Sequence, residues 1–298
     1  MIGRNTFKRL IKGTAGRAAV LTKPFAFSPT HPRACIFYYH RITDLGFVDS
    51  QVDDWNVPPR LFERQIAALA DYAEIVSLLD LPRRLELHSA NAKPLVCLTF
   101  DDGYANFYTQ ALPILELYHA PATAFVVTSL IGRSQPPPFD HWAQRNRDRA
   151  RPEAWRPMGW EELEACVASG LVTIGAHSHR HLKGSQCTPP QIVEEAERSR
   201  EILRGRLGEL QGRAYAYPYG SSRLKDVSPE YVQAVKAAGY ELAVTTDLGL
   251  ACAGSDPYLL PRIEAYGLDV PGVLKAKAVG ALAPYRLADH LRVVNRAL

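Results

Sequence analysis

The sequence contains no CxxC pair, and its cysteines are odd in number and widely separated, at Cys35, Cys97, Cys166, Cys187 and Cys252. A disulfide framework or a structural zinc site needs paired or closely spaced cysteines, so this spacing argues against both. We expect buried free thiols and a reducing compartment instead.

Long apolar runs are also missing, since no stretch approaches the roughly 18 uncharged apolar residues of a membrane-spanning helix. The beginning of the chain is a poor secretory signal, because Lys8, Arg9, Lys12 and Arg17 interrupt any apolar stretch of the required length. These features favour a cytoplasmic location.

Acidic residues are absent from residues 1–24, which hold six lysines and arginines. The formal net charge falls from +4 to −2 when these six cations are set aside. A surface for nucleic acid would spread its cations over the folded body of the protein. We therefore expect no nucleic-acid partner.

Residues 1–30 are interpreted as a basic amphipathic N-terminal segment, in which apolar residues alternate with cations. Two interpretations stay open for it. It is either a solvated lead-in that packs on the folded domain, or a peripheral attachment of residues 1–24 to the anionic inner membrane surface. Residues 31–298 are expected to form one catalytic domain, because single α/β domains of this size are common.

Short β-branched runs alternate with segments of helical period from residue 34 to about 280. This pattern predicts an α/β fold with a mostly parallel sheet. Residues 133–156, rich in proline and charge, are expected to form a long surface loop or excursion. The expected strands are 35–39, 95–100, 123–127, 172–176, 214–217 and 242–245, and the expected helices are 59–72, 111–118, 160–168, 190–207 and 229–238.

Polar residues follow several of the expected strands. In a barrel of parallel strands these positions share one rim, where such barrels build their active sites. The residues are His40, Asp101, Asp102, His177, His181 and Tyr219.

The segment TFDDG at residues 99–103 places two carboxylates at a strand end, directly before a glycine that permits a sharp turn. If the strand ends at Phe100, Asp101 and Asp102 point in different directions, so that one can bind a metal while the other works beside it. Taken alone, the pattern is equally typical of an ordinary turn.

Three histidines follow the strand at 172–176. His177 and His181 are four residues apart, a separation that places two imidazoles on one face of a helical turn, within reach of one cation. On that geometry His179 points elsewhere. Two neutral imidazoles and one carboxylate leave coordination positions open for water and substrate, which is typical of a hydrolytic site for Zn²⁺ or a similar divalent cation.

Three motifs together resemble those of the polysaccharide deacetylase family, carbohydrate esterase family 4: TFDDG, H-S-x-x-H at 177–181, and YPYG at 217–220. The resemblance implies an irregular (β/α)7 barrel, similar to a TIM barrel, that removes acetyl groups with a divalent metal. It implies Asp101 as the general base and Asp102, His177 and His181 as the metal ligands.

The YPYG motif implies that the backbone N–H of Tyr219 faces the developing oxyanion. Alone, this segment would indicate only a Pro-Gly turn packed by two tyrosines. The chain departs from the family at Ala216, where an arginine usually restrains the catalytic aspartate. Arg262, at another expected strand end, is the candidate replacement, and a purely structural arginine is the alternative.

The general acid is a second departure. Family members commonly carry it on a late histidine, whereas after His181 this chain has only His290, close to its last residue. The segment ending in YYH at residue 40 resembles the branch that deacetylates poly-N-acetylglucosamine, in which the motif order is circularly permuted. We therefore assign His40 as the acid, with a buried structural histidine as the alternative.

These assignments predict a hydrolase that removes N-acetyl groups from an N-acetylglucosamine-type polysaccharide or glycoconjugate. An O-acetyl carbohydrate esterase with the same centre, and a non-catalytic carbohydrate-binding relic, are the alternatives. Aromatic residues in connecting regions, Trp55 among them, are candidates for stacking on sugar rings. The oligomeric state is left open.

Overall fold

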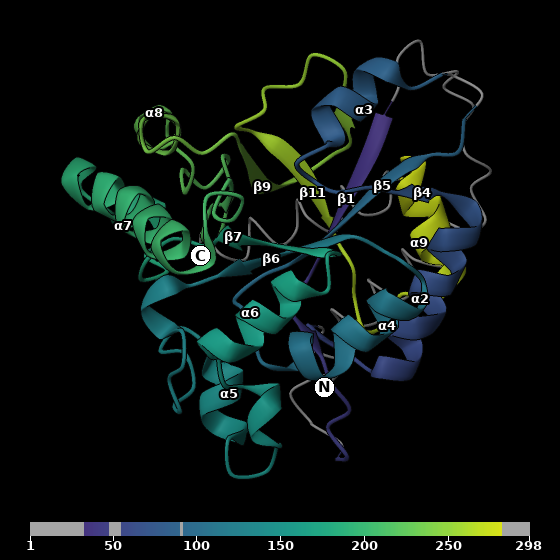
Figure 1. Ribbon diagram of the computed structural model, residues 1–298, viewed down its shortest axis with the longest axis horizontal. Helices are drawn as coiled ribbons and strands as arrows, with labels where there is room; N and C mark the ends of the chain where they lie inside the picture. The colour runs from purple at the N-terminus through teal and green to yellow at the C-terminus, as the bar shows by residue number, and fades with distance from the viewer. Residues whose placement is uncertain (1–32, 48–54, 90–91, 282–298) are drawn as a thin grey trace, which may run out of the picture.

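Seven parallel strands close into a barrel (Figure 1). The structure, a computed structural model, describes residues 33–47, 55–89 and 92–281. Strand β1 pairs with β5 on one side and with β11 on the other, which closes the ring and confirms the expected (β/α)7 barrel. The barrel strands are β1 (Arg33–Tyr39), β5 (Leu95–Phe100), β6 (Ala122–Val126), β7 (Val172–Ala176), β8 (Ala214–Ala216), β9 (Leu242–Leu248) and β11 (Leu260–Glu264).

Four shorter strands extend this frame. β10 (Ala251–Cys252) runs antiparallel to the start of β1, and β4 (Glu74–Ile75) runs parallel to β5. β2 (Arg41–Ile42) follows β1 almost directly and forms a separate parallel pair with β3 (Asn56–Val57). This pair fixes the backbone on the far side of His40.

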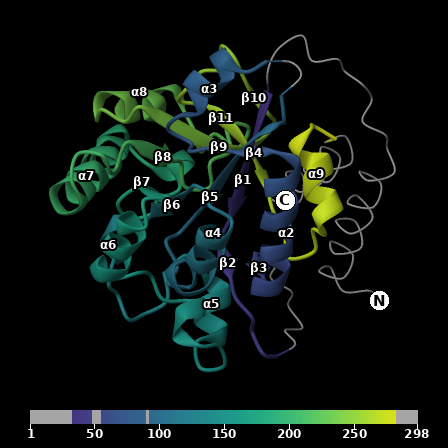
Figure 2. The same ribbon diagram turned by 45° about the vertical axis from the view of Figure 1, so that its right-hand side comes forward.

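Helices surround the barrel (Figure 2). Two expected helices match the structure at both ends and two others match within one residue, because proline opens three of these four and a clear apolar face defines them. The fifth begins as a π-helical turn at Phe107–Ala111 before it continues as α4. The helices are α2 (Pro59–Tyr72), α3 (Leu81–Leu87), α4 (Leu112–Leu117), α5 (His141–Asn146), α6 (Trp160–Ala168), α7 (Pro189–Leu207), α8 (Pro229–Ala237) and α9 (Pro271–Ala278).

Alternation along the strands divides the core into two layers. On β1, Ile36 belongs to a cluster with inward residues of β5 and β9, whereas Phe37 and Tyr39 pack in the layer that includes buried residues of the helices. The period of two residues continues past the strand ends. It directs Asp101 after β5, and Arg262 on β11, into the barrel interior.

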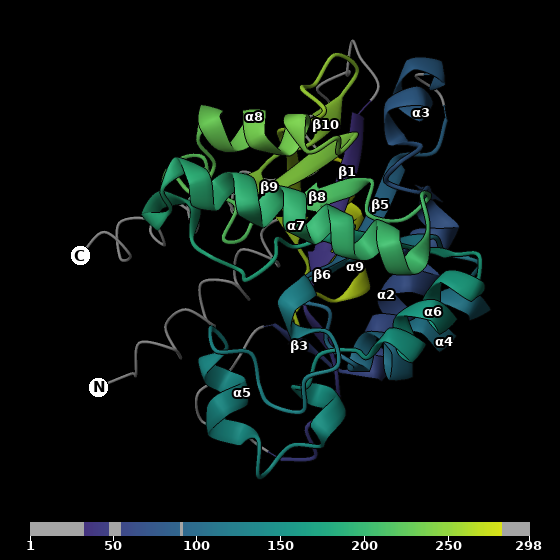
Figure 3. The ribbon, with the colours of Figure 1, turned by 60° about the vertical axis from the view of Figure 1, so that its left-hand side comes forward.

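The segment 133–156 is more ordered than the surface loop expected from its composition. It contains helix α5, which Figure 3 shows beyond one end of the barrel strands, and a 3₁₀ turn at Pro152–Ala154. Asp140 and Trp142 are buried, because Asp140 pairs with Arg41 and Trp142 packs in a small apolar cluster with Ala143. The segment is therefore an excursion with its own secondary structure and buried residues rather than an open loop.

The five cysteines, all within the described residues, are free, and Cys35, Cys97 and Cys166 are buried. Among the described residues, no helix combines the length and apolar character needed to cross a membrane. The expected basic segment at residues 1–30 and His290 lie outside the described residues.

Candidate active site

Asp101 is held by a fork of hydrogen bonds from Arg262. The Nη1 atom of Arg262 lies 2.7 Å from Oδ1 of Asp101, and Nη2 lies 2.8 Å from Oδ2. Both side chains are buried, and Nε of Arg262 donates to the carbonyl of Thr245. Arg262 therefore lies where it restrains the carboxylate, the position for which the sequence proposed it.

The charge state of Asp101 follows from this pair. Burial alone would raise the pKa of the carboxyl, but the charge and hydrogen bonds of Arg262 outweigh it and lower the pKa to about 2. Asp101 is therefore an oriented, ionised carboxylate at neutral pH. Each of its oxygens keeps a further lone pair beside the one that faces Arg262.

Asp102 turns away from Asp101 and faces two histidines. Its backbone adopts a positive φ of 70°, which separates the directions of the two adjacent carboxylates. The Oδ1 atom of Asp102 lies 3.6 Å from Nε2 of His177 and 3.5 Å from Nε2 of His181. The three ligand atoms lie within 4.8 Å of one another, close enough to contact one ion.

The donor atoms of this cluster suit a divalent cation. Nδ1 of His177 lies 2.8 Å from the carbonyl oxygen of Ala216, an acceptor, so Nδ1 carries the proton and Nε2 offers its lone pair to the cluster. Burial lowers the pKa of both His177 and His181, so that both rings are neutral at neutral pH. Two neutral imidazoles beside a carboxylate are a fitting ligand set for Zn²⁺.

The raised pKa of Asp102 also indicates a site suited to a cation. Burial, with the negative charges of Asp101 and Asp140, raises it to about 8. A divalent cation in contact with the carboxylate would offset this repulsion and favour the ionised form. The cluster is thus electrostatically matched to a bound cation.

The histidine segment is not the helical turn that the i, i+4 spacing suggested. Ser178 and His181 both have positive φ angles of 61°, so the segment is an irregular turn that brings the rings together in another way. His179 points away from the cluster, as expected, and its Nδ1 atom lies 2.9 Å from Oγ1 of Thr128. The positive φ angles of Ser178 and His181 are uncommon for residues with side chains, and surrounding contacts are needed to hold them.

His40 lies in the same pocket as this cluster, at the end of β1. Its ring stacks on Trp55 with a centroid distance of 4.5 Å and meets the edge of Tyr38 at 5.8 Å. Burial lowers the pKa of His40 to about 4, against the opposing effect of the Asp101 charge. The ring is therefore fixed in orientation, and it needs a nearby carboxylate to keep a proton.

Tyr219 forms part of the pocket wall and is 40% exposed. Its φ of 60° is uncommon for a residue with a side chain, and its carbonyl accepts a hydrogen bond of 2.7 Å from Oγ1 of Thr246. The next residue, Gly220, also has a positive φ, and an added Cβ there would lie 2.9 Å from the Thr246 nitrogen. These constraints fix the peptide that follows Tyr219 and so restrict the backbone of the residue whose own N–H the motif implies as an oxyanion donor.

The pocket has a volume of about 200 Å³ and a mixed polar and aromatic lining. Sequence reasoning missed Phe139, which stacks on the ring of His181 with a centroid distance of 3.7 Å. No sequence signal marks this residue, because only the fold of the segment 133–156 beside the pocket brings Phe139 to His181. Trp55, flagged as a candidate for sugar stacking, does line the pocket.

A buried polar cluster lies behind the pocket. Arg41 forms an ion pair with Asp140 and donates a 3.0 Å hydrogen bond to Tyr104, whose hydroxyl donates to Asp140 at 2.6 Å. The guanidinium also lies over the ring of Trp142, 4.5 Å from its centroid. This cluster joins the end of β1 to the Asp102 turn and to the segment that carries Phe139.

Comparisons with known proteins agree with this geometry. A sequence model of the polysaccharide deacetylase family matches residues 88–243, 156 of the 298 residues. The poly-β-1,6-N-acetyl-D-glucosamine N-deacetylase of Staphylococcus aureus is 23% identical over 246 residues, 76% of each protein. Deacetylase PplD of Streptococcus pyogenes, solved with acetate, superposes with a TM-score of 0.65 and 25% identity, covering 82% of this chain and 97% of that one.

A further solved structure shares the fold. IcaB of Ammonifex degensii superposes with a TM-score of 0.65 and 23% identity, covering 84% of this chain and 99% of that one.

Proposed function

The chain belongs to the polysaccharide deacetylase family, and on that premise we propose that it hydrolyses the N-acetyl groups of an N-acetylglucosamine-type glycan to acetate and a free amine. One observation carries the proposal. A single pocket joins the Asp102, His177 and His181 cluster to the arginine-bound Asp101 and to His40.

Asp102, His177 and His181 are the residues that would hold a divalent cation, for which we propose Zn²⁺. A bound cation supplies Lewis-acid chemistry, since it polarises a carbonyl and lowers the pKa of water. The three side chains leave coordination positions open, as a hydrolytic site requires.

Asp101 acts as the general base. It accepts a proton from the attacking water on a lone pair that Arg262 leaves available, while the water oxygen forms a bond to the acetyl carbon. The fork from Arg262 keeps the carboxylate ionised and aimed into the pocket. Arg262 thereby acts as a positioning residue rather than as a participant in proton transfer.

Tyr219 and His40 act on the other two atoms of the amide. The backbone N–H of Tyr219 donates to the carbonyl oxygen as negative charge develops on it. His40 donates a proton to the amide nitrogen as the carbon–nitrogen bond breaks, so that the product leaves as a neutral amine. Burial lowers the pKa of His40 to about 4, and the neighbouring charges of Asp101 and Glu264 oppose that shift and favour the protonated form that this step requires.

An N-acetylated sugar fits the lining of the pocket. Trp55, Phe139 and Tyr219 offer aromatic surfaces for the apolar face of a sugar ring, while carboxylates and histidines converge on the reacting group. A polymer is the substrate we favour, because a relative is named for poly-β-1,6-N-acetyl-D-glucosamine.

The proposal is tested by acetate release from N-acetylglucosamine oligosaccharides, with chelation and return of Zn²⁺. Asp102→Ala and His177→Ala should abolish metal-dependent release, because each removes a ligand. His179→Ala is the matched control, because that ring bonds to Thr128 outside the cluster and its loss should leave release largely intact.

Two outcomes would redirect the assignment. Release from O-acetylated sugars but not from N-acetylated ones would identify an esterase. Saturable glycan binding without turnover in added Zn²⁺ would identify a binding protein. Full activity in the Asp102→Ala variant would contradict the proposed metal site.

We further propose a cytoplasmic location, with residues 1–24 attached peripherally to the anionic inner surface of the membrane. The six cations of this segment, which has no acidic residue, support the proposal. Co-sedimentation with anionic liposomes should be seen for the full chain and lost when residues 1–24 are removed. Equal sedimentation of the two proteins would contradict it.

A further inference from the structure

The turn that carries His177 and His181 is fixed by hydrogen bonds at successive residues. The N–H of His177 donates to Val126 at 2.8 Å, and the carbonyls of Ser178 and His179 accept from Thr128 and Ser129 at 3.2 and 2.9 Å. These contacts tie the first half of the turn to the end of β6. They leave the position of the second half to other groups.

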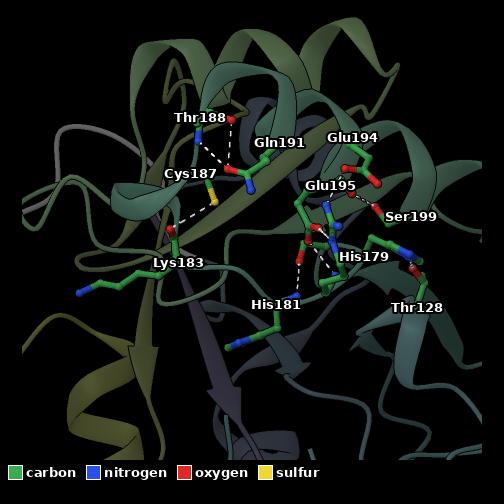
Figure 4. A network of polar contacts seen from close by, with 12 residues as sticks. Thr128, His179, His181, Lys183, Cys187, Thr188, Gln191, Glu194, Glu195 and Ser199 are labelled. Atoms are coloured by element: carbon green, nitrogen blue, oxygen red, sulfur yellow. Dashed lines mark hydrogen bonds and ion pairs between the residues drawn. The ribbon is translucent and has the colours of Figure 1, made fainter. Parts of the chain in front are cut away.

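The second half is held by Glu195 on helix α7. One carboxylate oxygen of Glu195 accepts the backbone N–H of Arg180 at 2.7 Å, and the other accepts Nε of the same residue at 2.7 Å. Figure 4 shows Glu195 on the helix beside the turn that carries His179 and His181. The bonded amide belongs to the residue directly before His181.

Glu195 is fully buried, in the middle of a helix of 19 residues. The backbone carbonyl of Glu195 also accepts a hydrogen bond of 2.7 Å from the hydroxyl of Ser199, one turn further along the helix. A buried carboxylate loses its hydration, so its two charge-assisted bonds to Arg180 must replace the lost water contacts. The turn and the helix are therefore coupled strongly and at a defined distance.

The start of helix α7 is fixed as well. Thr188 and Gln191 form a capping box, with the backbone N–H of Thr188 donating to Oε1 of Gln191 at 2.8 Å. The turn before it approaches the segment between β8 and α8 so closely that a Cβ on Gly184 would lie 2.0 Å from the carbonyl oxygen of Asp226. These contacts fix the residues that connect the histidine turn to the start of helix α7.

We propose that Glu195 is a positioning residue for the metal ligand His181. The backbone at His181 has a positive φ, and its N–H bonds back to Oγ of Ser178 at 2.9 Å, so the residue is held in an uncommon conformation. Glu195 keeps the preceding peptide in place and thereby keeps the imidazole facing Asp102. The inference rests on the proposed metal site.

Glu194 offers a matched comparison. Its carboxylate also contacts Arg180, at 2.6 Å from Nη2, but it is exposed and reaches only the end of the side chain. Exposed ion pairs contribute little, and this one does not touch the backbone of the turn. Neutralising Glu194 should therefore leave the histidine turn unchanged.

The experiment measures the dissociation constant for Zn²⁺ of the full-length metal-free protein, by competition with a chromophoric chelator. Glu195→Gln removes the charge and leaves one acceptor oxygen for two donors. We expect the dissociation constant to rise about 10- to 100-fold, the usual effect of losing a group that orients a ligand. Glu194→Gln should bind Zn²⁺ like the wild type.

A second readout separates positioning from general stability. In the Co²⁺ form, Glu195→Gln should show an altered visible absorption spectrum, whereas Glu194→Gln should not. Arg180→Ala provides a further variant if Glu195→Gln does not fold, because it deletes one of the two contacts at a half-exposed side chain and should raise the dissociation constant in the same direction.

The outcomes are distinct. Wild-type Zn²⁺ affinity and an unchanged Co²⁺ spectrum in folded Glu195→Gln, or in folded Arg180→Ala where Glu195→Gln does not fold, would overturn the role of Glu195 and leave the proposed function intact. If the wild-type protein itself binds no Zn²⁺, the proposed metal site fails and the role of Glu195 fails with it.

Discussion

Arg262 and Asp101 stand 161 residues apart in the chain and meet in the barrel interior through two hydrogen bonds of 2.7 and 2.8 Å. The family resemblance left the catalytic aspartate without its usual arginine, because Ala216 occupies that position. Arg262 supplies the same planar fork from β11. The proposed base is therefore restrained by an arginine that lies on another strand.

Replacing Arg262 by lysine should lower the turnover number on the order of 10²-fold, because a point charge cannot hold both carboxylate oxygens. The pKa of Asp101 should rise, so the acidic limb of the pH–rate profile should move to higher pH. Arg213→Lys is the control, since Arg213 forms a similar fork with Glu241 at the surface. An unchanged profile in Arg262→Lys would contradict the proposed role.

Replacing Asp140 by asparagine should destabilise the fold by about 3–5 kcal/mol, because it removes the charge of the carboxylate that forms a buried ion pair with Arg41. Urea unfolding of the two proteins measures this difference. Glu241→Gln, which breaks an exposed pair with Arg213, should cost less than about 1 kcal/mol. Equal losses in the two variants would show that burial of Arg41 does not matter.

Replacing His40 by glutamine should reduce N-acetyl hydrolysis about 10²- to 10⁴-fold, because the leaving amine then receives no positioned proton. Aryl acetates have leaving groups that depart without protonation, so their hydrolysis should fall much less. The ratio of the two rates, measured on the same protein preparations, tests the assignment. A parallel loss on both substrates would point to a structural role for His40.

The metal-free protein should lose stability as the pH falls from about 6.5 to about 4. Burial lowers the pKa of His40 from an ordinary 6.5 to about 4, so in this window the unfolded chain binds a proton that the folded chain does not. His177 and His181 shift in the same direction. Urea unfolding across this range should show a loss about 3 kcal/mol larger in the wild type than in His40→Gln.

Replacing Gly220 by alanine should lower the turnover number on the order of 10²-fold, because the new Cβ would meet the Thr246 nitrogen and displace the backbone of the neighbouring Tyr219, including its N–H. Gly132→Ala is the control. Gly132 also has a positive φ, of 75°, but an added Cβ there meets no atom within 4 Å. Steady-state rates of both variants separate displacement of the oxyanion donor from backbone strain alone.

Local patterns were sufficient to predict six of the seven barrel strands and most helices, while the seventh strand, β11, was indicated only as an expected strand end at Arg262. Buried β-branched runs such as 95–100 and 172–176 are unambiguous because every residue in them is apolar or small. The strand-end rule also predicted that Asp101, Asp102, His177 and His181 would gather at one rim. The structure places them there, while their chemical roles stay predictions.

The positions of some site residues depend on tertiary contacts that sequence patterns do not reveal. Glu195 stands in the charged helix sequence EEAERSRE and reads as a solvated residue, since only the packing of α7 on the histidine turn buries it. Asp140 and Phe139 belong to a stretch whose prolines and charges predict a loop. Asp140 is buried against Arg41 and half-buried Phe139 stacks on His181, and both of these partners are distant in the chain.

The closure of the barrel has a consequence for the order in which the enzyme is made. β1 is complete early in synthesis, but β11, its partner at the seam, follows more than 200 residues later. Until residue 262 leaves the ribosome, Asp101 has no arginine and β1 lacks one neighbour. The catalytic pocket is therefore assembled among the last events of biosynthesis, and the nascent chain must carry an unsealed sheet edge until then.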